Sequence, residues 1–201
     1  MKNAETIKMI LAMRKKYPVC ILVFLLLLIC EPALSQRFQF NEIEPNLKEI
    51  AIFVGYGANH RIPSATKDLF SIDALKIRFG RFTSPRNEVA IDISVSRLNT
   101  SISNTALWAT TTFRQFFFVR GFSAASWDIG FGIMHLQEKV SSLGTKTNFT
   151  EQLGLTFQYA TGPATAISIE YKIYHVSNGG IRLPNIGINA SLVSIGRSWY
   201  F

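Results

Sequence analysis

Apolar and polar residues alternate along much of this 201-residue chain. In residues 167–174 every second position from Ile167 to Ile173 is apolar, and the positions between them carry polar groups. Successive side chains of a β-strand point to opposite faces, so this period of two predicts a strand with one apolar face. Similar patterns recur in residues 50–56, 75–80, 89–96, 107–119, 127–134, 153–159 and 193–201. The sequence therefore predicts eight strands.

The residues on the opposite strand faces indicate where the apolar faces point. They are mostly small or polar, which suits a narrow barrel lumen, and no other segment has a pattern that would cover eight apolar faces with a second layer. The chain after residue 35 has no long apolar run and no helix-period segment, which excludes a helical membrane protein. We therefore expect an all-β, eight-stranded antiparallel transmembrane β-barrel over residues 49–201, with its apolar faces toward lipid.

Aromatic residues complicate one strand and mark the ends of others. Three consecutive residues, Phe116, Phe117 and Phe118, leave the phase of the pattern in 107–119 ambiguous, and we assign all three to the lipid-facing surface. Other aromatic residues near strand ends are expected to form interfacial girdles. These residues are Tyr56, Trp127, Tyr159, Trp199 and Tyr200.

The lengths of the connections predict the orientation of the barrel. Connections after the first, third, fifth and seventh strands are long, and those after the second, fourth and sixth are shorter, most clearly residues 161–163. Outer-membrane barrels keep short turns in the periplasm and long loops outside. Both termini are therefore expected to be periplasmic. The long connections are roughly residues 57–70, 97–106, 135–149 and 178–188.

The N-terminal residues predict an export signal. Basic residues precede residue 17, a short apolar run covers residues 19–29, and the small residues Ala33 and Ser35 fit a cleavage site. We predict a signal peptide over residues 1–35 that is removed, and a periplasmic lead-in over residues 36–48. A lipoprotein signal at Cys30 is the alternative, disfavoured because large residues flank that cysteine.

Removal of the signal changes what the composition implies. Both cysteines, Cys20 and Cys30, lie in the removed segment, which excludes a disulfide scaffold, a thiolate metal site and a cysteine nucleophile. The rest of the chain keeps 16 basic and 11 acidic residues, a modest excess that suits an anionic membrane or lipopolysaccharide. Export argues against nucleic acid as a partner. The sequence shows no metal cluster and no phosphate-binding loop, so neither a metal nor a cofactor is expected.

Two residues with chemical potential fall on the apolar side of the seventh strand. The alternation that ends at Ile173 places His175 and Ser177 on the lipid-facing side. Residues two apart in a strand project from one face about 6.5 to 7 Å apart, so the imidazole can lean toward the hydroxyl. A base beside a hydroxyl is what nucleophilic attack of a serine on an ester requires.

Neighbouring polar residues extend this candidate site. The Asn178 side chain, or the backbone N–H groups of Gly179 and Gly180, could hold a developing oxyanion. Asn189, in the paired strand and on the same side, could accept a hydrogen bond from the second imidazole nitrogen of His175 and fix its tautomer.

At these residues the chain resembles the lipid A 3-O-deacylase (PagL) family of outer-membrane barrels. The family motif His-x-Ser-Asn stands here at 175–178, and the following residues to Asn185 resemble the family's run of small residues and Pro-Asn. The resemblance implies hydrolysis of the ester-linked 3-position hydroxyacyl chain of lipid A. By family role Ser177 is the nucleophile, His175 the general base and Asn178 an oxyanion contributor. The C-terminal Phe201 also resembles the signature that the barrel-assembly machinery recognises.

This chain departs from the family's pattern at one position. The family's triad acid is a glutamate fourteen residues after the histidine, and in this chain that position is Asn189. No acidic residue follows Glu170, which by parity points into the lumen. An amide can orient a histidine but stabilises the imidazolium less than a carboxylate does. We therefore expect a slower deacylase, or one that uses a Ser-His-Asn triad.

Alternatives remain open at this stage. The barrel could be non-enzymatic, with a structural or adhesive role and a degenerate site, or it could bind or pass a small hydrophobic ligand. His60 and His135 are expected to be solvated near external loops. Arg182 is a candidate for contacting lipid A phosphates, whereas Arg197 is expected to reach the periplasmic interface. A homodimer is possible, and outer-membrane lipid surrounds the barrel in every case.

Overall fold

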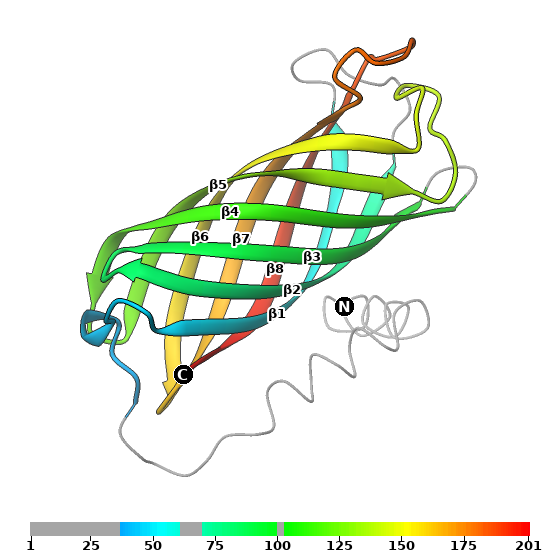
Figure 1. The fold of residues 1–201 in the computed structure, drawn as a ribbon. Helices are drawn as coiled ribbons and strands as arrows, with labels where there is room; N and C mark the ends of the chain where they lie inside the picture. The colour runs from blue at the N-terminus through cyan, green and yellow to red at the C-terminus, as the bar shows by residue number, and fades with distance from the viewer. Residues whose placement is uncertain (1–36, 61–69, 100–102) are drawn as a thin grey trace, which may run out of the picture. The chain divides into compact units, whose positions relative to one another are not determined.

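The barrel is closed, as the pattern predicts. The computed structural model describes residues 37–60, 70–99 and 103–201, and the predicted signal peptide lies outside these ranges. Each strand pairs antiparallel with its neighbour in the sequence, and β8 closes the sheet onto β1 (Figure 1). The strands are β1 (Lys48–His60), β2 (Ser71–Ser84), β3 (Asn87–Asn99), β4 (Asn104–Arg120), β5 (Ser123–Leu136), β6 (Thr147–Gly162), β7 (Thr165–Ser177) and β8 (Ile188–Tyr200).

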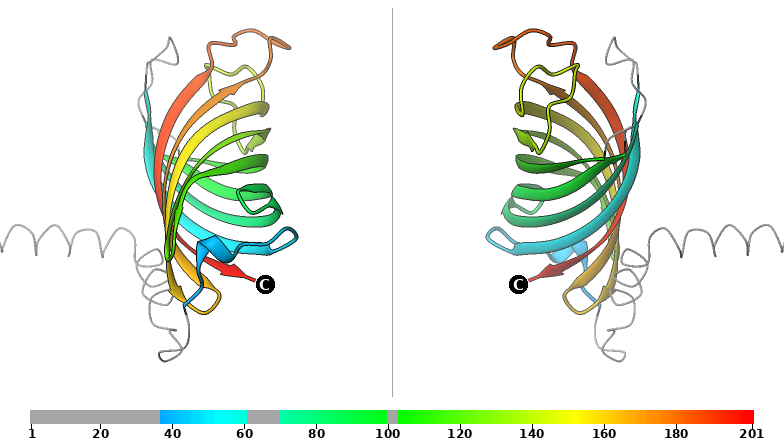
Figure 2. Two further views of the ribbon diagram at one scale, coloured as in Figure 1. Left: turned by 90° about the vertical axis from the view of Figure 1, so that its left-hand side faces the viewer. Right: turned by 90° about the vertical axis from the view of Figure 1, so that its right-hand side faces the viewer.

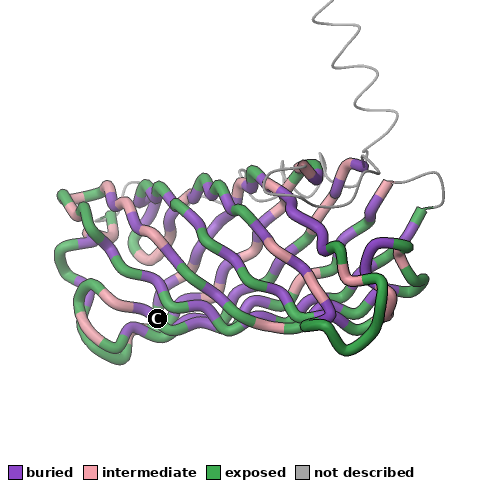
Figure 3. Tube along the Cα trace, turned by 90° about the horizontal axis from the view of Figure 1, so that it is seen from above, coloured by how far each residue is buried: buried purple, intermediate pink, exposed green. Residues whose placement is uncertain are grey.

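Side-chain exposure alternates along the strands with the apolar residues outside. In β2, Ile77 and Phe79 are exposed, whereas Lys76 and Arg78 are buried in the lumen. The same alternation of buried and exposed positions runs around the barrel in Figure 3. Among the described residues no helix is long and apolar enough to span a membrane. An apolar outer surface over a charged interior is the pattern of a barrel solvated by lipid.

A β-bulge resolves the ambiguous phase of β4. The register with β5 shifts between Phe116 and Phe118, so the bulge places two successive side chains on one side. Phe117 and Phe118 are exposed, but Phe116 is buried at 1%. The prediction that all three face lipid is therefore wrong for Phe116. Tyr200, expected in an aromatic girdle, also points inward and is buried.

Ion pairs fill the middle of the lumen. Arg78 donates from Nε and Nη2 to the two carboxylate oxygens of Asp92, both at 2.7 Å. Lys172 lies 3.0 Å from Asp128 and 3.5 Å from Glu170, which points inward as predicted. Removing a charge from water is costly unless an opposite charge and hydrogen bonds compensate. The interior therefore depends on matched charges contributed by several strands.

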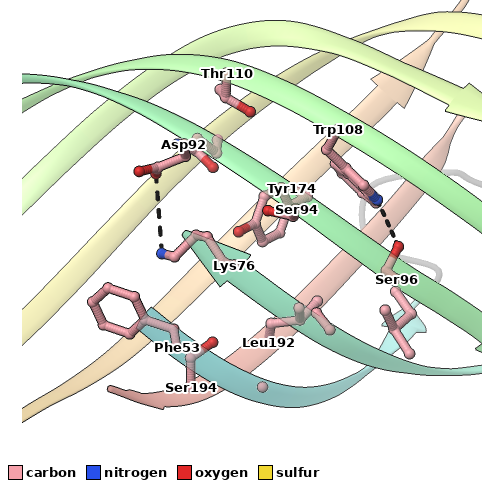
Figure 4. Close-up of a pocket in the computed structure, with 14 residues that line it drawn as sticks. Phe53, Lys76, Asp92, Ser94, Ser96, Trp108, Thr110, Tyr174, Leu192 and Ser194 are labelled. Carbon is pink, nitrogen blue, oxygen red and sulfur yellow. Dashed lines mark hydrogen bonds and ion pairs between the residues drawn. The ribbon is translucent and has the colours of Figure 1, made fainter. Parts of the chain in front are cut away.

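The cavity beside these ion pairs is small. Figure 4 shows Lys76 facing Asp92 at one side of it and the Trp108 indole donating to Ser96 at the other. The enclosed space is about 20 Å³, room for roughly one water molecule. Trp108 and Tyr174, at the other side of this space, stack edge to face with ring centroids 5.3 Å apart. Within the described residues, the lumen is packed with side chains, which counts against passage of a ligand.

Each end of the lumen is closed by an apolar cluster. One cluster lies where the connections are long, and it includes Trp108, Leu136, Leu143 and Val176. The other cluster lies near the C-terminus and combines residues before β1 with residues of the strands. Its members are Phe40 and Ile43 from before β1, and Phe82, Phe116, Ala124, Ala160, Ala166 and Tyr200 from the strands. The charged layer is thus separated from both mouths of the barrel.

The predicted lead-in is part of this second closure. A short 3-10 helix, η1 (Phe40–Glu42), begins the segment, and Phe40 is 1% exposed. Backbone hydrogen bonds join the segment to the turns and to β2, including Phe40 N to Gly121 O and Phe82 N to Leu47 O, each 2.8 Å. Figure 2 shows η1 (blue) at the barrel end that holds the C-terminus. The aperiodic residues before β1 therefore plug the barrel.

The connections alternate in length around the sheet. Two residues join β2 to β3, β4 to β5 and β6 to β7, and we call this side the short-turn end. Ten residues join β5 to β6 and ten join β7 to β8 at the other side, the long-loop end. The connection between β3 and β4 is shorter than predicted because both strands extend further. Residues 61–69 and 100–102 lie outside the described part.

Prediction for the lumen. Arg78→Ala leaves the Asp92 carboxylate without its bidentate partner in a buried site, so the free energy of unfolding should fall by about 3 to 5 kcal/mol. Arg81→Ala is the matched control on the same strand. Its side chain is exposed and donates to Asn46, so about 1 kcal/mol at most is expected. Urea titration of the folded barrel in lipid vesicles measures both. An equal loss of unfolding free energy in the two variants would contradict the conclusion that matched charges stabilise the lumen.

Candidate active site

The candidate site lies on the outer face of the barrel at the long-loop end. His175 and Ser177 are half-buried at the end of β7 and share the outward parity of the exposed residues Tyr171 and Ile173. Val176, between them, points inward and is 1% exposed. The imidazole and the hydroxyl therefore belong to the lipid-facing surface, as the alternation predicts.

His175 is held by Asn189 across the β7–β8 ladder. The two residues are direct partners in the register, and 2.6 Å separates His175 Nδ1 from Asn189 Oδ1. An amide oxygen only accepts, so Nδ1 carries the proton and Nε2 is the accepting nitrogen. This tautomer leaves Nε2 ready to take a proton. The Asn189 amide thus holds one nitrogen of the imidazole by a hydrogen bond.

Gly187 lies against the edge of the same imidazole. Its φ is +82°, and a Cβ at this position would come 2.9 Å from His175 Cε1. A side chain here would meet the ring and would also be strained in the left-handed backbone conformation. The residue therefore lets the β7–β8 connection return close beside the histidine.

Ser177 has an unengaged hydroxyl in this arrangement. Among the described residues its Oγ takes part in no hydrogen bond, including none with His175. Ser177 follows His175 by two positions on the same face, so rotation of either side chain brings the hydroxyl toward Nε2. Hydrogen bonds between catalytic groups are often long without substrate and tighten when it binds.

The buried Asn178 side chain organises the β7–β8 connection. Its Nδ2 donates to Leu143 O at 2.6 Å and to Arg182 O, while its Oδ1 accepts from Gly180 N at 2.9 Å. An amide nitrogen has two hydrogens, so both are used in these two bonds. The side chain thus holds the loop and has no hydrogen left for an oxyanion.

Two other donors next to Ser177 remain available. Asn178 N donates to Asn185 Oδ1 at 2.9 Å, which places the Asn185 amide beside the end of β7. Within the described part of the chain, the Asn185 Nδ2 and the Gly179 N–H donate no hydrogen bond. Asn185 was not assigned a role from the sequence, because its position depends on how the ten-residue connection folds back.

The β5–β6 connection supports this loop. Ile186 N donates to Ser142 O at 2.9 Å, and Gly144, with a φ of +67°, packs so closely that a Cβ would lie 2.7 Å from Pro184 O. No sequence pattern indicated these contacts, since residues 137–146 form a loop without periodicity. One long connection therefore holds the other in place.

The outer part of the β7–β8 connection is largely apolar and exposed. Ile181 and Leu183 are 75% and 85% exposed, and Ile186 is 55% exposed. Arg182, predicted to contact phosphate, is exposed beside them, and its carbonyl is the group that Asn178 binds. The structure thus places a basic residue among apolar ones next to the site.

The two other histidines differ from one another. His135 is exposed, and its Nδ1 lies 2.9 Å from Thr147 Oγ1. His60 is the β1 partner of Asn189, and its Nδ1 is buried and has no hydrogen-bond partner among the residues that the structure describes. The expectation that both are solvated is therefore wrong for the Nδ1 of His60.

An apolar exterior around a closed, charged interior defines the chain as an outer-membrane β-barrel, here with a hydroxyl, an imidazole and an amide gathered on its outer face. A family model described as Lipid A 3-O-deacylase (PagL) matches residues 77–198, more than half of the chain. The chain belongs to the lipid A 3-O-deacylase (PagL) family.

Solved structures agree with this fold. The crystal structure of the outer membrane enzyme PagL is similar at a TM-score of 0.59 and 16% identity, covering 73% of this chain and 97% of that one. Neisserial surface protein A is similar at 0.62 and 10%, covering 77% and 97%. The N-terminal barrel of Pseudomonas aeruginosa OprF is similar at 0.52 and 12%, covering 79% and 100%. No curated protein sequence matches the chain.

Prediction for the loop. Asn178→Asp keeps the acceptor for Gly180 N but removes both hydrogens that bind Leu143 O and Arg182 O. Two buried carbonyls then face a carboxylate, so local opening of residues 178–187 should become at least about tenfold more frequent. Amide hydrogen exchange at Gly180 and Ile186 measures this opening. Arg182→Ala is the control, because only its backbone carbonyl takes part, and slow exchange in both variants would contradict the role of Asn178.

Proposed function

We propose that this protein is a lipid A 3-O-deacylase that uses Ser177, His175 and Asn189. The observation that carries the proposal is the hydrogen bond from His175 Nδ1 to Asn189 Oδ1, two residues from a serine on the lipid-facing surface of a PagL family barrel. Polar groups on a lipid-facing surface cost free energy, so a cluster of them there points to a function. The ester bonds of lipid A lie in the membrane that this surface contacts.

The reaction follows from the proton positions. The Ser177 oxygen attacks the ester carbonyl while His175 Nε2 takes the hydroxyl proton. The tetrahedral intermediate collapses, the sugar oxygen leaves with the proton from His175, and the hydroxyacyl chain stays on Ser177 as an ester. A water molecule then gives a proton to His175 and attacks that ester. As the second tetrahedral intermediate collapses, His175 returns the proton to the Ser177 oxygen, which releases the hydroxy fatty acid and restores both residues.

The oxyanion needs donors close to Ser177. Among the described residues, the Gly179 N–H and the Asn185 amide have unused hydrogens close to the end of β7, and removing one such donor typically costs about 10²- to 10³-fold in rate. Asn178 is a positioning residue in this scheme, because its own hydrogens hold the loop that carries both donors.

An apolar groove beside β7 suits the acyl chain. It measures about 300 Å³ and is lined by Trp127, Leu153, Leu155, Tyr171 and Ile173. Tyr171 and Ile173 precede His175 on the same face of the same strand. A chain lying in this groove would bring its ester end toward the imidazole, and Arg182 is positioned in the adjoining loop to meet an anionic headgroup.

The orientation of the barrel belongs to the same proposal. With short turns and both termini on the periplasmic side, the long-loop end and Ser177 would lie at the outer leaflet, where lipid A is found. A non-enzymatic barrel is the second candidate, but nothing in the structure favours it.

Prediction for the nucleophile. Ser177→Ala should abolish loss of one hydroxyacyl chain from lipid A, leaving at most about 10⁻³ of the rate, because no other hydroxyl replaces the attacking oxygen. Ser123→Ala is the matched control, since this outward serine begins β5 at the short-turn end, the end of the barrel opposite to Ser177. Mass spectrometry of lipid A from expressing cells gives the result. Unmodified lipid A with a correctly folded wild-type barrel would favour the non-enzymatic alternative.

Prediction for the triad amide. Asn189→Glu supplies a carboxylate that stabilises the imidazolium formed when His175 takes the Ser177 proton. The deacylation rate should rise by about tenfold or more, since amides at this position of a triad reduce the rate strongly. Initial rates on purified lipid A in micelles measure the change. A rate that stays the same or falls would show that Asn189 does not occupy the position of the triad acid.

A further inference from the structure

An exposed carboxylate lies beside the candidate site on the outer face of β6. Glu151 is the register partner of His175 across the β6–β7 ladder, and it shares the outward parity of Leu153 and Leu155. Directly opposed residues in a sheet have Cβ atoms about 4.5 to 5.5 Å apart. Glu151 and Asn189 therefore flank His175 from the two strands beside β7.

This carboxylate has no partner in the described part of the chain. No described residue donates a hydrogen bond to Glu151 or forms an ion pair with it. Asp73, another outward carboxylate, differs in this respect, because it accepts from Asn99 Nδ2 at 2.8 Å. An ionised carboxylate only accepts hydrogen bonds, and hydrocarbon offers it no donor. Glu151 is therefore an acceptor that a ligand with a hydroxyl group can satisfy.

Phe149 covers the β6–β7 seam on the side of the long loops. It is the register partner of Ser177. Its ring lies against the β7–β8 connection, since a Cβ at Gly179 would come 3.2 Å from Phe149 Cδ2. An acyl chain whose ester meets Ser177 would therefore extend along the seam away from the long loops.

Such a chain passes Glu151 before it reaches the apolar groove beside β7. The next outward pair along the seam is Glu151 with His175. The pair after it, Leu153 with Ile173, lines the groove. Successive outward pairs are about 6.5 to 7 Å apart. The carbons nearest the ester would lie beside the carboxylate, and the remaining methylenes would lie in the groove.

We propose that Glu151 accepts a hydrogen bond from a hydroxyl on the acyl chain close to the ester, and so makes the site selective for hydroxyacyl esters over unsubstituted ones. The proposal rests on the proposed function for the ester that is bound and cleaved. A site that binds a substrate hydroxyl rejects the analogue without it, because the acceptor is then desolvated with no donor in return. An unsubstituted chain would leave the Glu151 carboxylate in that condition.

The rate test compares two glucosamine esters with acyl chains of equal length, one a 3-hydroxyacyl ester and the other unsubstituted. We expect the wild-type protein in micelles to prefer the hydroxyacyl ester by about ten- to hundredfold in kcat/KM, the range that a hydrogen bond to a charged group supplies. Glu151→Leu should remove most of this preference. Glu151→Gln keeps an accepting oxygen and should give an intermediate preference.

Glu138→Leu is the matched control for the change in charge. This carboxylate is exposed in the β5–β6 connection at the same end of the barrel, and it pairs with Lys146 at 3.4 Å. It lies in a loop and not in the β6–β7 seam, so its replacement should leave the preference at the wild-type value.

A binding test separates recognition of the hydroxyl from the reaction. In the Ser177→Ala background the ester stays intact, and isothermal titration in micelles gives the dissociation constant of each ester. The hydroxyacyl ester should bind more tightly than the unsubstituted one. Adding Glu151→Leu should make the two dissociation constants nearly equal.

The outcomes distinguish the role of Glu151 from the proposed reaction. An absence of selectivity in both rate and binding, or a preference that is unchanged in Glu151→Leu, would overturn the role. A rate that falls equally for both esters in Glu151→Leu would overturn it too, because a charge that acts only on His175 does not distinguish them. The same holds if Glu151→Gln is no more selective than Glu151→Leu. Selective binding that depends on Glu151, in a barrel that never cleaves either ester, would retain the role and reject the reaction.

Discussion

Closure of the sheet between β1 and β8 is the constraint on which the rest of the structure depends. In lipid, an open strand edge would leave backbone N–H and C=O groups without partners, each at a cost of several kcal/mol. Here the first and last strands pair along twelve register positions, from Glu49 with Tyr200 to His60 with Asn189. The same pairing brings residues from opposite ends of the chain together at the candidate site.

Closure also creates an interior that must be filled without water. Eight strands leave a lumen that side chains just fill, and here those side chains are matched charges between two apolar clusters. Burying such charges is not in itself strongly stabilising, but leaving one of them unmatched is costly. The interior is therefore filled by side chains, and the candidate site lies on the outer face. Polar side chains there stand out because lipid offers them no hydrogen bonds.

The strand pattern and the motif were readable because each depends on residues close in sequence. Alternation alone predicted which sides of β2, β3, β6 and β7 face lipid, and it placed His175 and Ser177 outside and Glu170 inside. Where local order was interrupted, the pattern was insufficient. Phe116 keeps the inward parity of the preceding part of β4, and the bulge that follows it turns Phe118 outward beside Phe117. The aperiodic residues around Phe40 close the short-turn end, since their apolar side chains pack there.

The sequence by itself determined the class of the protein, the number of strands, the outward direction of the candidate site and its resemblance to a deacylase family. These follow from a period of two and from a contiguous motif, and both are local properties of a chain in extended conformation. Only the tertiary structure decided which partners the site residues have. Asn178 is engaged by Leu143 from another loop, and Asn189 lies between His175 and His60 from the two neighbouring strands. Such partners are set by register and loop packing, which bring together residues that are distant along the chain.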